Sequence, residues 1–432
     1  MESAMAAPVV DRRRQLVSLF ARLRRSNGQA NPLPAYEQLR AMGEVIPAPW
    51  GGFLVTSYRL CNRVLRDKSW MVPDRDWRTR QEDTDRWSSP ASLQISDSLP
   101  MLNPPHHSRK RRSLGNVFHH GSLASLRPSI EKTVERLLDR FTEQLHQGPA
   151  DFVSLVSDEL PVITIGDWMN LPSGDYELLR SLTHDQVHTQ ELFPTSTERA
   201  LSDAATAQLR DYFSELINER RKAPGDDPVS SWIRTWDTLE PDPAVADKTV
   251  HSLALFMILA ALETTSHVLS DAVRLLLEHP RQLDLLRQQP ELVQDAIEEA
   301  LRYDAPIHMI SRVAAADTEL GGVLVPAGGM VQLMVGAAHH DPAEYTDPHA
   351  FDVRRGRGRH GGCPAAATAP PPHLSFGAGI HYCLGSALAR TEATVLLNAL
   401  LERPFRLRIS APPQWAPRVA FRRMRSLQLA LV

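Results

Sequence analysis

The chain has 432 residues, of which 42% are hydrophobic and 23% are charged, and its formal net charge is −3. This composition is typical of a soluble globular protein and excludes a disordered chain. The near-neutral charge balance gives no indication of a nucleic-acid partner or of binding to an anionic membrane surface.

The N-terminal 30 residues contain several arginines but no apolar stretch followed by a small-residue cleavage site, which a secretory signal would require. We therefore expect a cytoplasmic protein with an N-terminal extension at 1–30 and one large domain at 31–432. Its three cysteines, Cys61, Cys363 and Cys383, are an odd and sparse set that argues against a disulfide framework. Each cysteine is thus available for ligand chemistry.

Helical periodicity dominates the chain, and apolar residues recur three and four apart over 123–145, 204–221, 290–303 and 385–401. Strand patterns are short and occur at 52–56, 322–326 and 330–335. The sequence therefore predicts a mainly α protein with a small β-sheet region.

Residues 67–100 are rich in charge, Trp, Ser and Pro and lack sustained periodicity, which predicts a mobile loop region. Its tryptophans Trp70, Trp77 and Trp87 either close over a pocket or pack on the surface. The stretch 356–372 is also irregular and contains Cys363, and we expect a surface excursion there.

The segment 251–279 has a centre that is apolar on every side, so a membrane span is one interpretation. A span needs about 20 apolar residues without charge, and Glu263, His267 and Asp271 interrupt the segment too early. We therefore predict a long helix through the core of a soluble protein.

Residues 373–385 place glycines, aromatic residues and Cys383 directly before a predicted helix. Glycine permits positive φ angles and close approach of the backbone to a flat ligand. The dipole and free N–H groups of the following helix favour thiolate, the form of cysteine that binds iron. Backbone N–H donors in such a loop can also tune the sulfur. The pattern indicates that Cys383 is a metal ligand.

This loop resembles the haem-binding loop of the cytochrome P450 family, whose fixed positions are filled by Phe376, Gly377, Gly379, His381, Cys383 and Gly385. The resemblance extends from about residue 31 to the C-terminus, and it implies the cytochrome P450 fold and a heme b cofactor (iron protoporphyrin IX) with Cys383 as iron ligand. The alternative is a zinc site formed by His360, Cys363, His381 and Cys383. It is disfavoured because the last two residues are closer in sequence than usual zinc-ligand pairs, and because it leaves Phe376 and the glycines unexplained.

Residues 260–265, Ala-Ala-Leu-Glu-Thr-Thr, lie in the middle of the predicted long helix. A threonine hydroxyl can bond back to the carbonyl one turn earlier and open the helix locally, and an acid beside it can relay protons. The segment is similar to the oxygen-activation motif of the family, with Ala261 where glycine is commoner. The resemblance implies Glu263 and Thr264 as catalytic residues and Ala261 as a residue beside the haem.

The resemblance also implies partners for the two haem propionates, namely His107, Arg111, Arg312 and His373, with His381 as a further candidate. Glu299 and Arg302 resemble the structural ion pair of the family, for which Arg355 fits the spacing of the third member better than Arg354. The adjacent histidines at 339 and 340 cannot easily share one helical face, so we predict a structural role for both.

As a family member the chain would be a haem-dependent monooxygenase that inserts one atom of O2 into a C–H bond of a small organic metabolite, in secondary metabolism. A ferredoxin with its NAD(P)H-dependent reductase would supply electrons, and Arg109, Lys110 and Arg112 are predicted to attract this acidic partner. Two alternatives remain open: oxidative cyclisation or coupling without net oxygen insertion, and a non-catalytic haem gas sensor. An apolar ceiling over the substrate is expected from Leu255, Phe256, Leu259 and Leu262, and a polar contact from His308.

Overall fold

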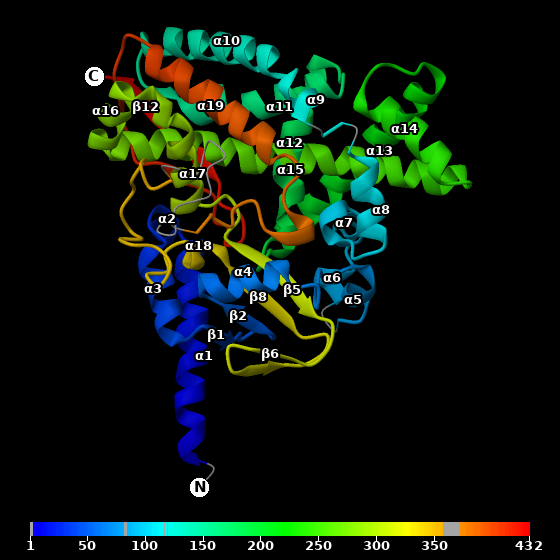
Figure 1. Cartoon of the computed structure of the whole chain (residues 1–432), viewed down its shortest axis with the longest axis vertical. Helices are drawn as coiled ribbons and strands as arrows, with labels where there is room; N and C mark the ends of the chain where they lie inside the picture. The colour runs from blue at the N-terminus through cyan, green and yellow to red at the C-terminus, as the bar shows by residue number, and fades with distance from the viewer. Residues whose placement is uncertain (1–2, 82–83, 116, 119, 357–370) are drawn as a thin grey trace. The chain divides into compact units, whose positions relative to one another are not determined.

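The computed structural model describes residues 3–81, 84–115, 117–118, 120–356 and 371–432. The chain forms two compact units, each built from segments that are distant in sequence (Figure 1). Unit 1 comprises Met1–Met71, Ser270–Cys383 and Pro404–Val432, and unit 2 comprises Val72–Leu269 and Leu384–Arg403. The 36-residue helix α15 (Pro243–Glu278) begins in unit 2 and ends in unit 1.

Unit 1 contains a five-stranded sheet of order β1-β2-β8-β5-β3, in which only the β2–β8 pair is parallel. Its strands are β1 (Val45–Pro47), β2 (Phe53–Val55), β3 (Trp70–Met71), β5 (Met309–Ala314) and β8 (Met330–Met334). Antiparallel pairs form between β6 and β7, β9 and β12, and β10 and β11. Their bounds are β6 (Thr318–Leu320), β7 (Val323–Val325), β9 (Leu407–Ile409), β10 (Gln414–Trp415), β11 (Met424–Ser426) and β12 (Gln428–Leu431).

Unit 1 also contains helices. In chain order they are α1 (Ser3–Arg24), α2 (Ser26–Ala30), α3 (Leu33–Met42), α4 (Tyr58–Arg66), α16 (Pro280–Gln288), η5 (Pro290–Leu292), α17 (Val293–Tyr303), α18 (Val335–Ala338) and η6 (Gly379–His381). In α1, Leu16, Leu19, Phe20 and Leu23 are buried, and Phe20 packs edge-on against Trp50. The predicted extension at 1–30 thus contains a helix that contributes to the core of unit 1.

Unit 2 is almost entirely helical, and α10 and α19 lie side by side in it (Figure 1). Its elements are α5 (Arg75–Thr79), α6 (Thr84–Trp87), α7 (Pro90–Ser96), η1 (Leu99–Met101), α8 (His106–Ser113), α9 (His120–Ala124), α10 (Arg127–Leu145), β4 (Ala150–Asp151), η2 (Val153–Ser157), α11 (Glu159–Trp168), η3 (Ser173–Asp175), α12 (Tyr176–Gln186), η4 (Val187–Gln190), α13 (Ser196–Lys222), α14 (Pro228–Leu239), the first part of α15, and α19 (Ser386–Glu402).

The predicted mainly α architecture with a small β region is confirmed, but the prediction of an irregular loop at 67–100 is wrong. That stretch forms β3, three short helices and η1. Asp74 caps α5 by accepting a hydrogen bond from the Trp77 N–H, and Ser89 caps α7 in the same way from Ser92. Such caps stabilise helices too short to show apolar periodicity. Trp77 and Trp87 pack edge to face with ring centroids 5.2 Å apart, while Trp70 lies in β3.

The apolar segment predicted at 251–279 is part of α15, which is long and apolar enough to cross a membrane by length and composition. Its most apolar window has a mean hydropathy of 1.6, and 78% of that window is buried inside the protein. Burial of this kind satisfies an apolar helix without lipid, so the structure supports the predicted core helix.

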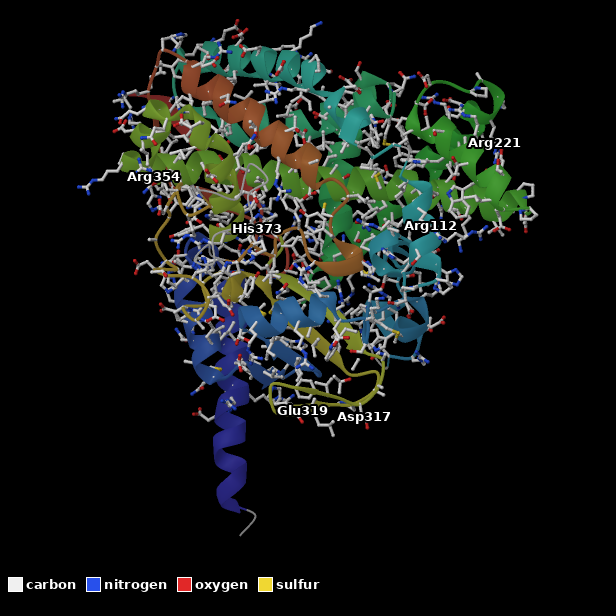
Figure 2. The ribbon with its side chains drawn as sticks, in the orientation of Figure 1. Arg112, Arg221, Asp317, Glu319, Arg354 and His373 are labelled. Carbon is white, nitrogen blue, oxygen red and sulfur yellow. The ribbon has the colours of Figure 1, made fainter. Side chains whose placement is uncertain are left out.

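The predicted ion triad is confirmed, and Arg355 rather than Arg354 completes it. Glu299 accepts bonds from Arg302 at 2.7 and 2.8 Å and from the Nε of Arg355 at 3.1 Å. The guanidinium of Arg302 also donates to the main-chain carbonyls of His339, Pro348 and Ala350. Arg354 is exposed (Figure 2), and its guanidinium donates to the side chain of Gln289 at 3.3 Å, away from Glu299. The triad therefore holds residues 339–355 against α17.

Replacement of either arginine by alanine gives a matched test of this triad. Arg355→Ala leaves the buried Glu299 with one partner fewer, and we expect it to lower the free energy of unfolding by about 3 kcal/mol. Arg354→Ala removes an exposed side chain and should change it by no more than about 0.5 kcal/mol. Urea unfolding followed by circular dichroism measures both. Equal losses in the two variants would contradict the assignment of Arg355.

Candidate functional site

The loop that carries Cys383 is closed by its own backbone. The N–H of Cys383 donates to the carbonyl of Phe376 at 2.9 Å, and the N–H of Gly377 donates to that of Leu374 at 2.8 Å. Gly377 and Gly379 have φ angles of 68° and 67°, which confirms the predicted need for glycine at these positions. Gly385 differs, because it is the N-cap of α19 with a φ of −82°.

Gly379 also permits a close approach of two backbones. A Cβ atom at this position would lie 2.4 Å from the carbonyl oxygen of Leu65 and 3.1 Å from the Cα of Arg66, both in the last turn of α4. Neither atom can move without shifting the helix. The glycine thus fixes the distance between the cysteine loop and α4 within unit 1.

The two described cysteines differ sharply in environment. Cys61 is fully buried, donates to the carbonyl of Val55 at 3.4 Å, and has its pKa raised far above the usual range by burial and by Asp341. Cys383 is exposed at the surface of its loop, three residues before α19 begins. Because metal binding requires an accessible thiolate, Cys383 fits the role of ligand and Cys61 does not. Cys363 and most of the predicted excursion at 356–372 lie outside the described residues.

Helix α17 fixes the start of this loop by two direct contacts and by a third that runs through His339. The Nε2 of His373 is 3.2 Å from a carboxylate oxygen of Glu298, and Ser375 donates to the carbonyl of Leu301 at 2.6 Å. His339 accepts the N–H of Leu374 at 2.7 Å, and its own carbonyl accepts from Arg302. Burial lowers the pKa of His339 well below its usual value, which keeps its ring neutral and able to accept.

The structural role predicted for His339 and His340 is supported, because both rings bond to nearby main chain. His340 lies between the carbonyls of Tyr303 and Pro348, at 2.8 and 2.9 Å. His308, predicted as a polar contact for substrate, is buried in unit 1 between Tyr36 and Asp304. It belongs to the core of that unit.

His373, predicted as a propionate partner, contacts protein groups through both ring nitrogens, and its propionate role stays a prediction. His373 is labelled in Figure 2. Its Nδ1 accepts the N–H of Ser375 at 3.2 Å, so the proton must be on Nε2, which is 3.2 Å from Glu298. Both ring nitrogens are therefore engaged. The sequence could not reveal this, because Glu298 lies 75 residues before the histidine.

Arg312 meets the requirement for a propionate partner. Its side chain lies in β5 and is buried, and its one hydrogen bond within the described residues runs from Nη1 to the carbonyl of Ser311 at 2.8 Å. No carboxylate of the described residues forms an ion pair with it, and burial lowers its pKa to about 10. A buried cation needs a counter-ion, so an anionic group of a cofactor fits here.

The remaining predicted propionate residues include His107 and Arg111 on α8 in unit 2, with His107 buried and Arg111 half-buried. The loop before α8 is fixed by Asn103, which accepts the N–H of Val72 at 2.9 Å and donates to Asp74 at 2.8 Å. His381 is half-buried in η6 of unit 1.

The basic cluster predicted for ferredoxin docking is smaller than expected. Lys110 points inward, where it donates to the carbonyl of Asp97 and to Ser252, each at 2.8 Å, and burial lowers its pKa to about 8. Arg109 pairs with Glu240 at 3.1 Å and lies over the ring of Trp236. Arg112 is exposed at the surface of α8 (Figure 2).

Helix α15 presents one open face within its buried length. Phe256, Ala260, Ala261 and Thr264 are partly or fully exposed, whereas Leu255, Leu259 and Leu262 are buried. The prediction that these three leucines form an apolar ceiling over the substrate is therefore wrong. Thr264 donates to the carbonyl of Ala260 at 2.9 Å as predicted, but α15 remains a regular α-helix at this point, without the expected opening.

Glu263 lies beside this open face but is itself buried. One of its carboxylate oxygens is 2.6 Å from the Nδ1 of His184 on α12. The Nε2 of the same ring is 3.7 Å from Asp158, which in turn accepts a hydrogen bond from Ser266. Sequence reasoning missed His184, because 79 residues separate it from Glu263 and no local motif marks it.

Comparison with known proteins decides the family. The family model for cytochrome P450 matches residues 176–420. "Polyketide biosynthesis cytochrome P450 PksS" of Bacillus subtilis (strain 168) is 30% identical over 408 residues, which cover 93% of each chain. The chain belongs to the cytochrome P450 family. It is therefore an oxidoreductase of the cytochrome P450 monooxygenase class, with a haem-iron cofactor.

Two further cytochromes P450 support this assignment. "Cytochrome P450 monooxygenase PikC" of Streptomyces venezuelae is 30% identical and matches over 93% of this chain and 91% of its own. The solved structure of P450BioI in complex with hexadec-9Z-enoic acid ligated acyl carrier protein has a TM-score of 0.83 at 29% identity, covering 94% of this chain and 99% of the other. Family membership accounts for Phe376 and the loop glycines, which the zinc alternative left unexplained.

The role of Gly379 can be tested with a glycine of similar backbone angle. Gly379→Ala combines a strained positive φ with a clash against α4, whereas a Cβ atom at Gly322, where φ is 77°, would have no atom of the described residues within 4 Å. We expect Gly322→Ala to lower the free energy of unfolding by about 1–2 kcal/mol and Gly379→Ala to lower it further and reduce haem content. Thermal unfolding and the haem-to-protein ratio measure the two effects. Equal stability and haem content in both variants would show that the approach to α4 is unimportant.

Proposed function

We propose that this P450 inserts one atom of O2 into a C–H bond of a small organic metabolite in secondary metabolism. The observation that carries the proposal is the exposure of Thr264 on the open face of α15, next to the buried acid Glu263. A hydroxyl beside an acid, on a face otherwise made of Phe256 and two alanines, suits controlled proton delivery next to an apolar substrate.

The proposed cofactor is heme b, with Cys383 as the thiolate ligand of its iron. The exposed thiol and the glycines of its loop support this role, as does the buried guanidinium of Arg312 for a propionate. His107, Arg111 and His381 are proposed as further propionate partners, and Ala261, Phe376, Gly377, Gly379 and Gly385 as residues beside the ring. When bound, the haem iron supplies dioxygen activation, and thiolate ligation favours O–O cleavage.

Thr264 and Glu263 would act on protons. In the structure the Thr264 hydroxyl uses its proton to bond the Ala260 carbonyl, which leaves its oxygen lone pairs able to accept a hydrogen bond. Glu263, on the adjacent residue, can supply a proton that this hydroxyl passes on. Phe256 and the alanines at 260 and 261 make the rest of this open face apolar.

The proposed electron source is a ferredoxin, which receives electrons from NAD(P)H through a reductase. Within the part of the chain that the structure describes, Arg112 is the member of the predicted basic cluster that remains exposed without an ion pair, which supports a docking role for it. We propose a cytoplasmic location. As substrates, compounds related to polyketides and long-chain acyl groups are candidates, because the names of two similar proteins mention them.

The proposal is tested with the protein reconstituted with a ferredoxin, its reductase and NADPH. A macrolide, a long-chain fatty acid and a steroid are first compared by the spectral shift each causes, and the compound with the largest shift is turned over under ¹⁸O2. The product is expected to contain one ¹⁸O atom and to account for most of the NADPH consumed. A product without ¹⁸O would instead indicate oxidative coupling, and NADPH consumption that does not depend on the compound would favour a sensor.

Thr264→Ala extends the same experiment. We expect this variant to keep its haem and to consume NADPH, while product per NADPH falls about tenfold or more and hydrogen peroxide rises, because proton delivery is no longer directed. Unchanged product yield would mean that water or the substrate supplies the protons.

A further inference from the structure

The contact between Glu263 and His184 joins two helices of unit 2. His184 lies in the last turn of α12 and Glu263 in the middle of α15. Their side chains approach to 2.6 Å between Nδ1 and Oε1, which is a short hydrogen bond. The carboxylate of Glu263 is therefore oriented by an imidazole from another element.

The same imidazole faces a second carboxylate. Its Nε2 is 3.7 Å from a carboxylate oxygen of Asp158, the residue directly before α11. Asp158 also accepts a hydrogen bond from Ser266 of α15. When this ring is protonated, each of its nitrogens carries a proton and faces one carboxylate. One turn earlier on α12, Arg180 pairs with Glu159 of α11, so these two neighbouring charges compensate each other.

Exposure distinguishes the two partners. The side chain of Glu263 is 3% exposed and that of His184 is 23% exposed. A proton can therefore reach the imidazole from solvent more readily than it can reach the carboxyl group. From the solvent side the proton meets His184 first and then the buried Glu263, whose neighbour in the chain, Thr264, lies on the open face of α15.

We propose that His184 positions the carboxylate of Glu263 and resupplies it with protons from solvent. The Nδ1–H bond of the imidazolium breaks as an O–H bond forms on Glu263, and the ring becomes neutral. A proton from solvent then restores the imidazolium. This inference rests on the proposed function of Glu263 and Thr264, and it adds a positioning and proton-exchange residue that comes from α12.

Two substitutions separate positioning from proton exchange. In His184→Asn the amide nitrogen can replace Nδ1 as a donor to Glu263, but it cannot exchange a proton at neutral pH. His184→Ala removes both functions. His188→Asn is the matched control, because this half-buried histidine lies one turn further along and faces Glu198 of α13 at 3.9 Å.

The first readout needs no substrate and no turnover. We expect His184→Ala and Glu263→Gln each to lower the midpoint of thermal unfolding, and the double variant to lower it by less than the sum of the two, because both remove the same contact. His184→Asn should stay closer to the parent than His184→Ala. Strictly additive shifts would overturn the positioning role.

The second readout is product per NADPH, with the macrolide, fatty acid or steroid that causes the largest spectral shift. We expect His184→Asn to lower this ratio about tenfold, as Glu263→Gln does, and His188→Asn to leave it unchanged. If Glu263→Gln lowers the ratio and His184→Asn does not, proton exchange by His184 is refuted and the proposed function stands. If Glu263→Gln has no effect, the proposed function itself fails.

Discussion

The buried carboxylate of Glu299 pairs with the guanidiniums of Arg302 and Arg355. Arg302 connects it to the loop that carries Cys383. Arg302 donates to the carbonyl of His339, whose ring accepts the N–H of Leu374. Leu374 and Phe376 then accept from Gly377 and Cys383 and close the loop. Because every link is a hydrogen bond between buried or backbone groups, the position of the exposed thiol depends on an ion pair more than 80 residues earlier in the chain.

Glu263 and Thr264 are positioned by the packing of helix α15 and not by a chain of hydrogen bonds. Most of α15 is buried, and this packing determines which face of the helix stays open. The open face carries Phe256, Ala260, Ala261 and Thr264. The acid Glu263 is then oriented by His184 from α12. Rigid packing thus sets where the hydroxyl lies, while a single polar contact sets the direction of the carboxylate beside it.

Features encoded in short motifs could be predicted from the sequence. The cysteine loop and the Glu299–Arg302 pair are short motifs that the resemblance to the family identified, and the long helix followed from its continuous apolar pattern. Arg355 also followed from its spacing. Contacts between distant segments could not be predicted: His373 with Glu298, His184 with Glu263, and the inward turn of Lys110 toward Ser252. The short helices at 75–96 were missed because their caps act without periodicity.

The central claim is that Cys383 and not Cys61 binds the haem iron, and the carbon monoxide difference spectrum of the reduced protein tests it most directly. The parent and Cys61→Ser should both show the long-wavelength Soret band that thiolate ligation produces, because Cys61 is sealed in the core of unit 1. Cys383→Ser should lose that band. A band that survives in Cys383→Ser, or that disappears in a folded Cys61→Ser variant, would contradict the account.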